Sequence, residues 1–322
     1  MHILVIGGAG YIGSHVVKEL LSHNVKVTVY DDLSTGQEIN LFSGTDFVKG
    51  SILDVPLLRE TMKKDVTGVI FLAAKKAVGE SMQNPEKYST NNLIGTINVL
   101  NTMTETGVKQ FIFSSSAAVY GAPQYLPIDE KHPVNPMSFY GFTKLATERL
   151  LKWYNELKGI RFVALRYFNA VGYDANGDVK GLEKNPQNLL PIIMEVATQK
   201  REKLAVFGND YDTPDGTCLR DYIHVTDLAT GHWKALEHLT NGGNSEIVNL
   251  GTGKGISVLE MLKKTEEVIG RPVPFSFEPR RPGDPAIVVA SSDKAKELLH
   301  WQATHSDLDN IIRTTWAVYK NQ

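Results

Sequence analysis

The sequence is poor in cysteine and has no long apolar run. Its single cysteine, Cys218, excludes an internal disulfide, and no spacing of cysteine and histidine resembles a zinc site. No segment approaches the ~20 apolar residues of a membrane-spanning helix. The N-terminal apolar run is too short for a signal-peptide core and lacks a basic region before it. These absences predict a cytoplasmic protein without a metal site or a membrane anchor.

An excess of charge of either sign is also missing. Lysine and arginine number 34 against 36 aspartates and glutamates, a net charge of -2, so bulk electrostatics give no reason to expect nucleic acid or an anionic membrane as a partner. A small molecule is the better expectation. With 322 residues, of which 42% are hydrophobic, the chain exceeds one average domain and can bury a large core.

The clearest motif is a glycine cluster that follows the first apolar segment. Residues 2–6 are mainly branched aliphatic and run into Gly7, Gly8, Gly10 and Gly13, after which a helix-compatible segment begins. Such glycines permit a tight turn, a close approach of the backbone to a pyrophosphate, and packing of the new helix on its strand. The positive helix N-terminus would then hold the phosphates. This pattern predicts a dinucleotide site.

A second apolar run supports that prediction. Residues 25–30 end in Asp31 and Asp32, about 20 residues after the glycines, where an acidic side chain is expected to hold the adenosine ribose hydroxyls. A carboxylate there disfavours a 2′-phosphate. NAD is therefore the expected cofactor, in preference to NADP.

Apolar runs alternate with helical patterns through the first half of the chain. The runs lack strict two-residue polarity, which indicates a parallel sheet covered by helices on both faces. The predicted fold class is α/β, a doubly wound parallel Rossmann sheet with a smaller mixed α/β C-terminal lobe. The expected strands are residues 2–6, 25–30, 47–48, 68–72, 111–113 and 162–165, and the expected helices are residues 11–22, 55–63, 86–105 and 139–157.

The second lobe is expected to begin where Gly, Asn and Pro become frequent. We assign residues 1–169 to an NAD-binding domain and residues 170–322 to a smaller substrate-binding lobe. The boundary is interleaved, because residues 222–225 and 247–250 look like further buried strands.

Polar side chains gather where the expected strands end, which is the edge at which such sheets bind ligands. Ser114, Ser115 and Ser116 follow one strand, while Tyr140 and Lys144 lie four residues apart, on one face of an expected helix. A free tyrosine has a pKa near ~10, and an adjacent ammonium lowers it by stabilising the phenolate. A phenolate can take a proton from a substrate hydroxyl while a hydride leaves the same carbon.

Taken together, these motifs resemble those of the extended short-chain dehydrogenases/reductases, and among them the UDP-galactose 4-epimerase family. The glycine turn and the Tyr140/Lys144 pair belong to the broad superfamily, and the resemblance covers essentially the whole chain. The more specific stretches are residues 76–81 (KAVGES), 114–121 (SSSAAVYG), 165–169 (LRYFN), 220–225 (RDYIHV) and 280–284 (RRPGD).

The resemblance implies an isomerase that interconverts UDP-galactose and UDP-glucose at carbon 4, through a transient 4-keto sugar, using tightly bound NAD. It implies Tyr140, Lys144 and Ser116 as catalytic residues. For NAD binding it implies Gly7, Gly10, Tyr11, Ile12, Asp31, Ser51, Ile52, Lys76, Asn91, Ser114, Tyr140, Lys144 and Tyr167. For UDP-sugar binding it implies Ser116, Asn169, Asn188, Leu189, Phe207, Arg220, Arg281, Asp284 and Val288.

The arginines suit this ligand, because guanidinium is a rigid, bidentate donor to a diphosphate. The sequence leaves structural alternatives open: a local salt bridge for Arg220 and Asp221, a solvated loop for Arg280 and Arg281, and a core position for Phe207.

The chain departs from the family pattern at two positions near the adenosine. An acidic residue commonly follows the Gly50 equivalent and accepts from the adenine amino group, whereas here Ser51 offers a hydroxyl. A common asparagine after Asp31 is replaced by Asp32, which adds negative charge near the ribose and favours NAD further.

Two other functions on this fold are alternatives. A nucleotide-sugar 4,6-dehydratase or decarboxylase shares fold and cofactor, but dehydratases usually have an Asp-Glu pair where this chain has Ala117 and Ala118. A non-catalytic NAD-sensing protein would be expected to lose Tyr140 or Lys144, and both are present.

The resemblance also favours two further expectations. Apolar residues at helical spacing favour a homodimer through residues 86–105 and 139–157. A tyrosine that excludes an N-acetyl group in the family is replaced by Val288, which suggests that UDP-N-acetylhexosamines are accepted too. The apolar residues in question are Leu93, Ile94, Ile97, Leu100, Leu145, Leu150 and Leu151.

Overall fold

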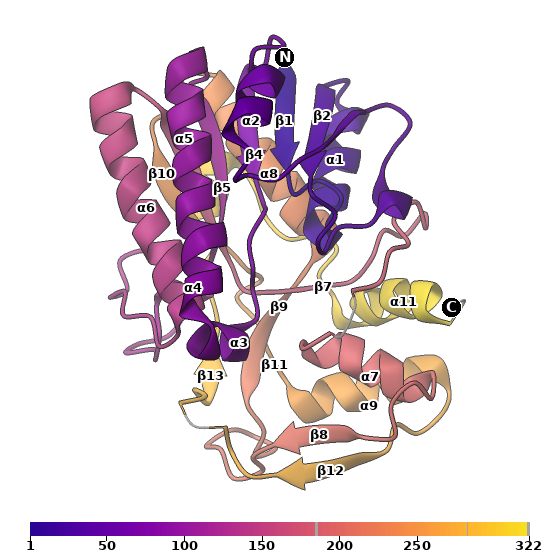
Figure 1. The fold of residues 1–322 in the computed structure, drawn as a ribbon. Helices are drawn as coiled ribbons and strands as arrows, with labels where there is room; N and C mark the ends of the chain where they lie inside the picture. Colours follow the sequence, from indigo (N-terminus) through magenta and orange to yellow (C-terminus); the bar gives the residue numbers. More distant parts are fainter. Residues whose placement is uncertain (184–185, 282, 321–322) are drawn as a thin grey trace.

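The computed structural model describes residues 1–183, 186–281 and 283–320 (Figure 1), so Pro282 of the 280–284 motif lies outside the described residues. Its central sheet is parallel throughout and has the order β3-β2-β1-β4-β5-β6-β10. The strands are β1 (His2–Ile6), β2 (Lys26–Asp31), β3 (Asp46–Lys49), β4 (Gly68–Phe71), β5 (Gln110–Ser116), β6 (Arg161–Tyr167) and β10 (Glu246–Leu250).

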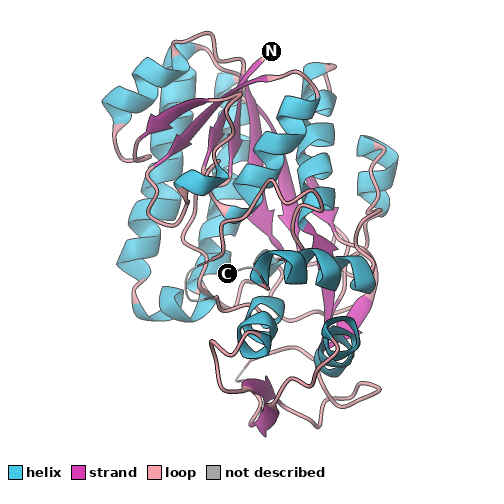
Figure 2. Ribbon diagram, turned by 90° about the vertical axis from the view of Figure 1, so that its right-hand side faces the viewer, coloured by secondary structure: helices cyan, strands magenta, loops and turns pink. Residues whose placement is uncertain are grey.

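Helices cover both faces of this sheet, as Figure 2 shows, and the strand sequences explain why. Ile3 and Val5 of β1 belong to an apolar cluster with α1 (Tyr11–Ser22) and α8 (Val225–Thr240), whereas Leu4 and Ile6 belong to a cluster on the opposite face. That second cluster includes residues of α2 (Val55–Met62), α5 (Gly95–Thr106) and α6 (Phe139–Lys158). Each fully buried aliphatic side chain stabilises the fold by about 1.5–3 kcal/mol. Unbroken apolar strands are the consequence of this two-sided burial.

The smaller lobe has a mixed architecture. Its main sheet pairs β9 (Leu219–His224) in parallel with β7 (Asn169–Val171) and β13 (Ile287–Val288), and antiparallel with β11 (Gly255–Ser257). A second ladder joins β8 (Leu204–Phe207) to β12 (Phe275–Glu278). The helices α7 (Leu189–Ala197), α9 (Val258–Ile269), α10 (Asp293–Leu299) and α11 (Leu308–Tyr319) complete the C-terminal part. The predicted α/β fold class is confirmed.

The strands after residue 170 are divided between the two sheets. Residues 246–250 form β10, which extends the central sheet beside β6. Residues 222–224 lie instead in β9 of the smaller sheet, and helix α8 begins directly at Val225. The chain therefore crosses between the sheets more than once.

The helix expected over residues 86–105 is composite. It consists of α4 (Pro85–Tyr88), a π-helical turn η2 (Ser89–Ile94) and α5, and the short helix α3 (Val78–Gln83) precedes it. Asn92, within the π-helical turn, is buried and bonds to the backbone N–H and C=O of Lys75 at 2.9 and 3.0 Å. A wider turn of this kind re-aims side chains and is common near functional sites.

A segment of the second half lies against the first helix. We call residues 172–183 the crossing segment, because it runs from the end of β7 across the face of α1. Its backbone and carboxylates are bound by side chains from α1 and from the loops after β2 and β4. These pairs are Lys18 with Asp174 and Asp178, His15 with the N–H of Asp174, Asn40 with the N–H of Gly181, Gln37 with the C=O of Leu182, and Lys76 with Glu183.

Two further observations bear on ligands. Among the described residues, no helix is long and apolar enough to cross a membrane. Within the same residues, no group of His, Cys, Asp and Glu side chains is arranged to hold a metal ion.

Candidate active site

The strand order reverses between β1 and β4, so the loops after these two strands diverge and open a crevice at the carboxyl edge of the sheet. The glycine turn fills the bottom of this crevice. Gly7 has φ +87°, and a Cβ there would lie 2.7 Å from the backbone nitrogen of Ala73. A Cβ on Gly13 would lie 2.1 Å from the carbonyl oxygen of Gly7. These two glycines are required by the packing of the turn itself.

Gly10 differs from its neighbours. A Cβ there would meet only the carbonyl oxygen of Gly7, at 3.3 Å, so the protein alone does not demand glycine at this position. Gly10 is also the N-cap of α1, and no side chain caps this helix end. The turn is therefore a cradle that a Cβ would fill, floored by an uncapped helix N-terminus, and a pyrophosphate fits that environment.

Asp31 ends β2 beside this cradle. Its carboxylate accepts hydrogen bonds from the backbone N–H groups of Ala9 (3.0 Å) and Leu33 (2.8 Å). Burial raises the pKa of Asp31, and these two hydrogen bonds oppose the rise. Each oxygen retains a lone pair for a ribose hydroxyl, whereas a phosphate would be repelled. The residues present thus fit NAD.

The remaining residues implied in NAD binding lie around the same edge with various partners. The hydroxyl oxygen of Ser51 accepts from the N–H of Leu53 at 3.2 Å and keeps its own proton to donate. Ile52 is buried, and its side chain packs against Gly95. Lys76 forms a 2.9 Å ion pair with Glu183, and the amide of Asn91 donates to the C=O of Lys87 at 2.9 Å.

The polar residues at the ends of β5 and β6 converge on α6. Lys144, 3% exposed, donates to the C=O of Ser114 at 2.7 Å, and its Nζ lies 5.8 Å from the centre of the Tyr140 ring. The hydroxyl of Ser114 hydrogen-bonds that of Tyr167. Ser116 hydrogen-bonds Tyr140 and accepts from the N–H of Ala118 at 3.2 Å. The helix thus presents Tyr140 and Lys144 together, as the spacing predicts.

The electrostatics of this pair differ from the expectation. Burial raises the pKa of Tyr140, and only the hydrogen bond from Ser116 acts to lower it. Burial also lowers the pKa of Lys144 to about 7, which the charge of Glu148 opposes. The predicted lowering of the tyrosine pKa by the ammonium is therefore wrong for the protein alone, because burial raises the pKa of the phenol and disfavours the charged form of Lys144.

The residues implied in UDP-sugar binding gather on the facing lobe. Arg220 forms an ion pair with Asp284, whereas Asp221 turns away from Arg220 to accept from the N–H groups of Thr252 and Gly253 at 2.8 and 3.0 Å. The alternative of a local Arg220–Asp221 salt bridge is therefore wrong. Asn169 donates to the C=O of Asp221 at 3.1 Å.

Aromatic and apolar side chains complete this side. The guanidinium carbon of Arg281 lies 3.9 Å from the centre of the Phe207 ring. Arg280 is exposed, as the solvated-loop alternative expects, and it lies 4.1 Å over the ring of Tyr211 and bonds Asp210 at 2.7 Å. Val288 pairs with Arg220 in the sheet.

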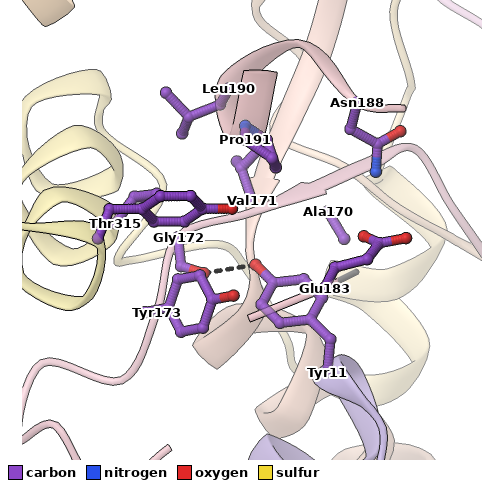
Figure 3. Close-up of a pocket in the computed structure, with 11 residues that line it drawn as sticks. Tyr11, Ala170, Val171, Gly172, Tyr173, Glu183, Asn188, Leu190, Pro191 and Thr315 are labelled. Carbon is purple, nitrogen blue, oxygen red and sulfur yellow. Dashed lines mark hydrogen bonds between the residues drawn. The ribbon is translucent and has the colours of Figure 1, made fainter. Parts of the chain in front are cut away.

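Figure 3 shows a small cavity where the two groups of residues approach each other. The hydroxyl of Tyr11 donates to the C=O of Gly172 across it, while Glu183 and Asn188 also line it. Leu189 begins helix α7 between the lining residues Asn188 and Leu190, and Ile12 packs on the apolar cluster beneath α1. Ser116, Tyr140 and Lys144 are not among the lining residues, so this cavity is separate from the proton-transfer group.

Several residues of the site were not singled out from the sequence. Asn92 also donates to the Thr143 hydroxyl at 3.1 Å, which ties the π-helical turn to α6. The hydroxyl of Ser81 accepts from the N–H of Tyr140 at 3.1 Å. Ser81 lies in the KAVGES motif, which was a signal for its role, whereas nothing local distinguishes Asn92 from Asn91.

A doubly wound sheet with a glycine cradle, an acidic residue ending β2 and a Tyr-Lys pair on one helix defines the extended short-chain dehydrogenase/reductase class. A family model described as "NAD dependent epimerase/dehydratase family" matches residues 3–251. The chain belongs to that family, which confirms the resemblance predicted from its motifs.

Individual relatives are similar over the full length. UDP-glucose 4-epimerase of Halalkalibacterium halodurans is 45% identical, with 99% of this chain and 96% of that protein covered. The structure of UDP-glucose 4-epimerase from Brucella ovis in complex with NAD matches with a TM-score of 0.97 at 45% identity, covering 99% of this chain and 98% of that one. The UDP-Glc/GlcNAc 4-epimerase of Campylobacter jejuni matches with a TM-score of 0.88 at 35% identity, covering 100% and 99%.

The contrast between Gly10 and Gly13 gives a testable prediction. Gly10→Ala is expected to fold with near-normal stability and to lose most NAD affinity, because the new methyl group fills the cradle. Gly13→Ala, the matched comparison, is expected to lose about 1–3 kcal/mol of stability, because its methyl group must displace the Gly7 carbonyl. Thermal unfolding and calorimetric titration with NAD measure both. Normal NAD affinity in folded Gly10→Ala would show that the cofactor lies elsewhere.

Proposed function

We propose that this protein is an isomerase that epimerises UDP-sugars at carbon 4 with tightly bound NAD and so interconverts UDP-galactose and UDP-glucose. The observation that carries the proposal is the meeting of the glycine cradle, Asp31 and the Ser116–Tyr140–Lys144 group at one edge of the sheet. UDP-glucose 4-epimerases that are similar over the full length support the choice of reaction.

In this proposal Tyr140 takes the proton from the carbon-4 hydroxyl, and Ser116 is hydrogen-bonded to the same phenol. When bound, NAD supplies the hydride acceptor and then the donor at carbon 4, so the sugar passes through a 4-keto state. The phenol must lose its proton in a buried position, where the charged form is disfavoured. Lys144 supplies the positive charge that favours the phenolate, and the Ser114 carbonyl fixes its ammonium group. Tyr140 returns the proton when the hydroxyl is regenerated.

The two sides of the crevice would divide the ligands. Residues 1–169 would hold NAD, and residues 170–322 would hold the UDP-sugar. Arg220 and Arg281 offer rigid donors to the diphosphate, and Phe207 offers an aromatic face.

The nearest alternative reaction, dehydration of a nucleotide sugar, would need acidic groups that Ala117 and Ala118 do not supply. Ala117 and Ala118 form the 3-10 turn directly after Ser116, at the place where dehydratases usually carry an acidic pair. Methyl groups there can neither donate nor accept a proton. The site therefore favours epimerisation over elimination of water.

The proposal is tested with purified protein and no added cofactor. We expect NAD to be released on denaturation, and UDP-galactose to be converted to UDP-glucose. Tyr140→Phe should keep NAD and UDP affinity but lose about 10²–10⁴-fold in kcat, because only proton transfer loses its group. Near-normal turnover in Tyr140→Phe would remove this residue from the mechanism, and an inactive wild type that binds both ligands would refute the reaction.

A homodimer is part of the proposal. Leu100, Leu145 and Leu151 are buried within one chain, so the expectation that these three contribute to a free apolar surface is wrong. An exposed apolar stripe nevertheless remains on α6, together with Ile94 of the π-helical turn η2. Its members are Ile94 (50% exposed), Phe142 (45%), Trp153 (60%) and Leu157 (66%). Apolar area of this extent favours a partner, and a second copy presents the same stripe.

Light scattering tests the dimer. Wild-type protein should have twice the mass of one chain, and Trp153→Glu combined with Leu157→Glu should yield monomers, because the charges would face each other across the interface. Ile39→Glu, at another exposed apolar residue, serves as the control and should stay dimeric. A monomeric wild type contradicts the proposal.

Substrate range is expected to depend on Val288. This side chain packs against a cluster that includes Val119 and Phe168, next to the strand bearing Arg220. Because valine lacks the ring that excludes an N-acetyl group in the family, we propose that UDP-N-acetylglucosamine is also a substrate. A named UDP-Glc/GlcNAc 4-epimerase among the similar structures supports this extension.

Kinetics on both sugars test the role of Val288. We expect Val288→Tyr to lose at least about tenfold in kcat/KM for UDP-N-acetylglucosamine and to keep most activity on UDP-glucose, because apolar size differences discriminate by ~1–3 kcal/mol. Equal losses on both sugars, or no acetylated turnover by the wild type, would contradict this role.

A cytoplasmic location completes the proposal. It is supported by the one cysteine, Cys218, which is a free and buried thiol, as is usual in a reducing compartment.

A further inference from the structure

A buried ion pair lies behind the proton-transfer group and is not explained by it. Glu148 and Arg166 are 1% and 4% exposed. The guanidinium donates twice, from Nε to one carboxylate oxygen at 2.8 Å and from Nη2 to the other at 2.6 Å. The hydroxyl of Ser115 donates to the same carboxylate at 2.6 Å. Burial acts to lower the pKa of Arg166, but the bonds to Glu148 outweigh it and raise the pKa, so the guanidinium keeps its charge.

This pair is joined to the proposed catalytic residues through two elements. Tyr140, Lys144 and Glu148 follow each other at four-residue spacing on one face of α6. Ser115 lies between Ser114, whose carbonyl holds the Lys144 ammonium, and Ser116, which bonds Tyr140. The Glu148 carboxylate therefore fixes Ser115, the strand residue that lies between the two residues making these contacts.

The surroundings of Lys144 identify Glu148 as its electrostatic partner. Around Nζ lie the carbonyl of Ser114, the ring of Phe113 at 4.9 Å and the ring of Tyr140 at 5.8 Å. Within the described residues, Glu148 is the one charged group that affects the Lys144 pKa.

Other elements of the fold also place charged and polar groups around the Glu148 carboxylate. Arg166 comes from β6, and its guanidinium carbon lies 4.8 Å over the ring of Tyr120. The Tyr120 hydroxyl donates to Asn249 at 2.6 Å, and Glu130 accepts from the N–H of Asn249 at 2.7 Å. Tyr167, next to Arg166, is bonded to Ser114.

We propose that Glu148 is a positioning residue of the epimerase reaction, which holds β5 against α6 through Ser115 and keeps the ammonium of Lys144 charged. This inference rests on the proposed function for its kinetic consequence only. Glu148 reaches neither ligand and acts through Lys144 and the serine strand.

The sign of the effect follows from the charges. Burial holds the pKa of Lys144 at about 7 while Glu148 opposes a further fall. Removing the anion lowers the pKa of Lys144, so the ammonium is lost at lower pH and the phenolate of Tyr140 loses its support. The alkaline limb of the kcat profile should therefore move to lower pH, because it follows the loss of the Lys144 ammonium.

Glu148→Gln tests the charge, and Ser115→Ala tests the hydrogen bond with the charge retained. We expect Glu148→Gln to move the alkaline limb of kcat down by about one pH unit, with KM for UDP-galactose changed less than twofold. Ser115→Ala should lower kcat without moving the limb. Equal limb shifts in both variants, or no shift in folded Glu148→Gln, would overturn the proposal.

A measurement without turnover separates this proposal from the proposed function. The ¹⁵N NMR signal of Lys144 Nζ is titrated with pH in lysine-labelled protein, and a matching protein with Lys144→Met identifies that signal. We expect its midpoint to fall in Glu148→Gln whether or not the wild type epimerises UDP-galactose. An unmoved midpoint overturns the role of Glu148, whereas a moved midpoint with an inactive wild type contradicts the reaction alone.

A double variant covers the case in which Glu148→Gln does not fold. That variant leaves Arg166 buried without its anion, which is the costly half of breaking such a pair. Glu148→Gln with Arg166→Gln removes both charges and should fold. It still lacks the anion near Lys144, so it should show the lowered Lys144 midpoint, and an unmoved midpoint would overturn the proposal.

Discussion

The architecture of the site depends on one close contact between backbones. The start of α1 lies so near the end of β1 that a single Cβ on Gly13 would overlap the Gly7 carbonyl, and Gly7 in turn lies against the backbone after β4. This contact brings an uncapped helix end to the point where the strand order reverses. The functional side chains at the ends of β2, β5 and β6 are placed relative to that point by the parallel register of the sheet.

The carboxyl edge of the sheet is both polar and buried, and its polar groups therefore bond to each other. The three serines at the end of β5 have separate partners in Tyr167, Glu148 and Tyr140. Asp221 accepts from the loop after β10 instead of from its neighbour Arg220. A buried network that is fully bonded in this way is rigid, whereas one missing partner would leave a costly unpaired group. Rigidity here favours a fixed proton acceptor.

Local patterns in the sequence predicted what depends on local geometry. The strand-turn-helix of residues 2–22 and the shared face of Tyr140 and Lys144 follow from spacing alone, and the structure has them. The ion pair of Arg220 with Asp284 joins residues distant in sequence, and no periodicity reports it. The π-helical turn at Ser89–Ile94 depends on the Asn92–Lys75 contact, which is equally non-local.

Burial was the other quantity that the sequence did not give. The direction of the Tyr140 pKa shift reverses because the phenol is enclosed, and enclosure is a property of the assembled fold. In the same way Leu100, Leu145 and Leu151 have the spacing of a surface stripe but point into the core, while Trp153 and Leu157 on the same helix system remain exposed. Hydrophobic spacing identifies a face of a helix but does not say which neighbour covers it.

The crossing segment, residues 172–183, has a kinetic consequence. It is fastened to α1 and the neighbouring loops by Lys18, His15, Asn40 and Gln37, none of which comes from the proton-transfer group. These bonds share one short stretch of chain, so the segment can leave α1 only when they break together, as a local unfolding event and not as a side-chain rotation. Residues remote from the chemistry thereby hold this part of the second half of the chain against the first helix.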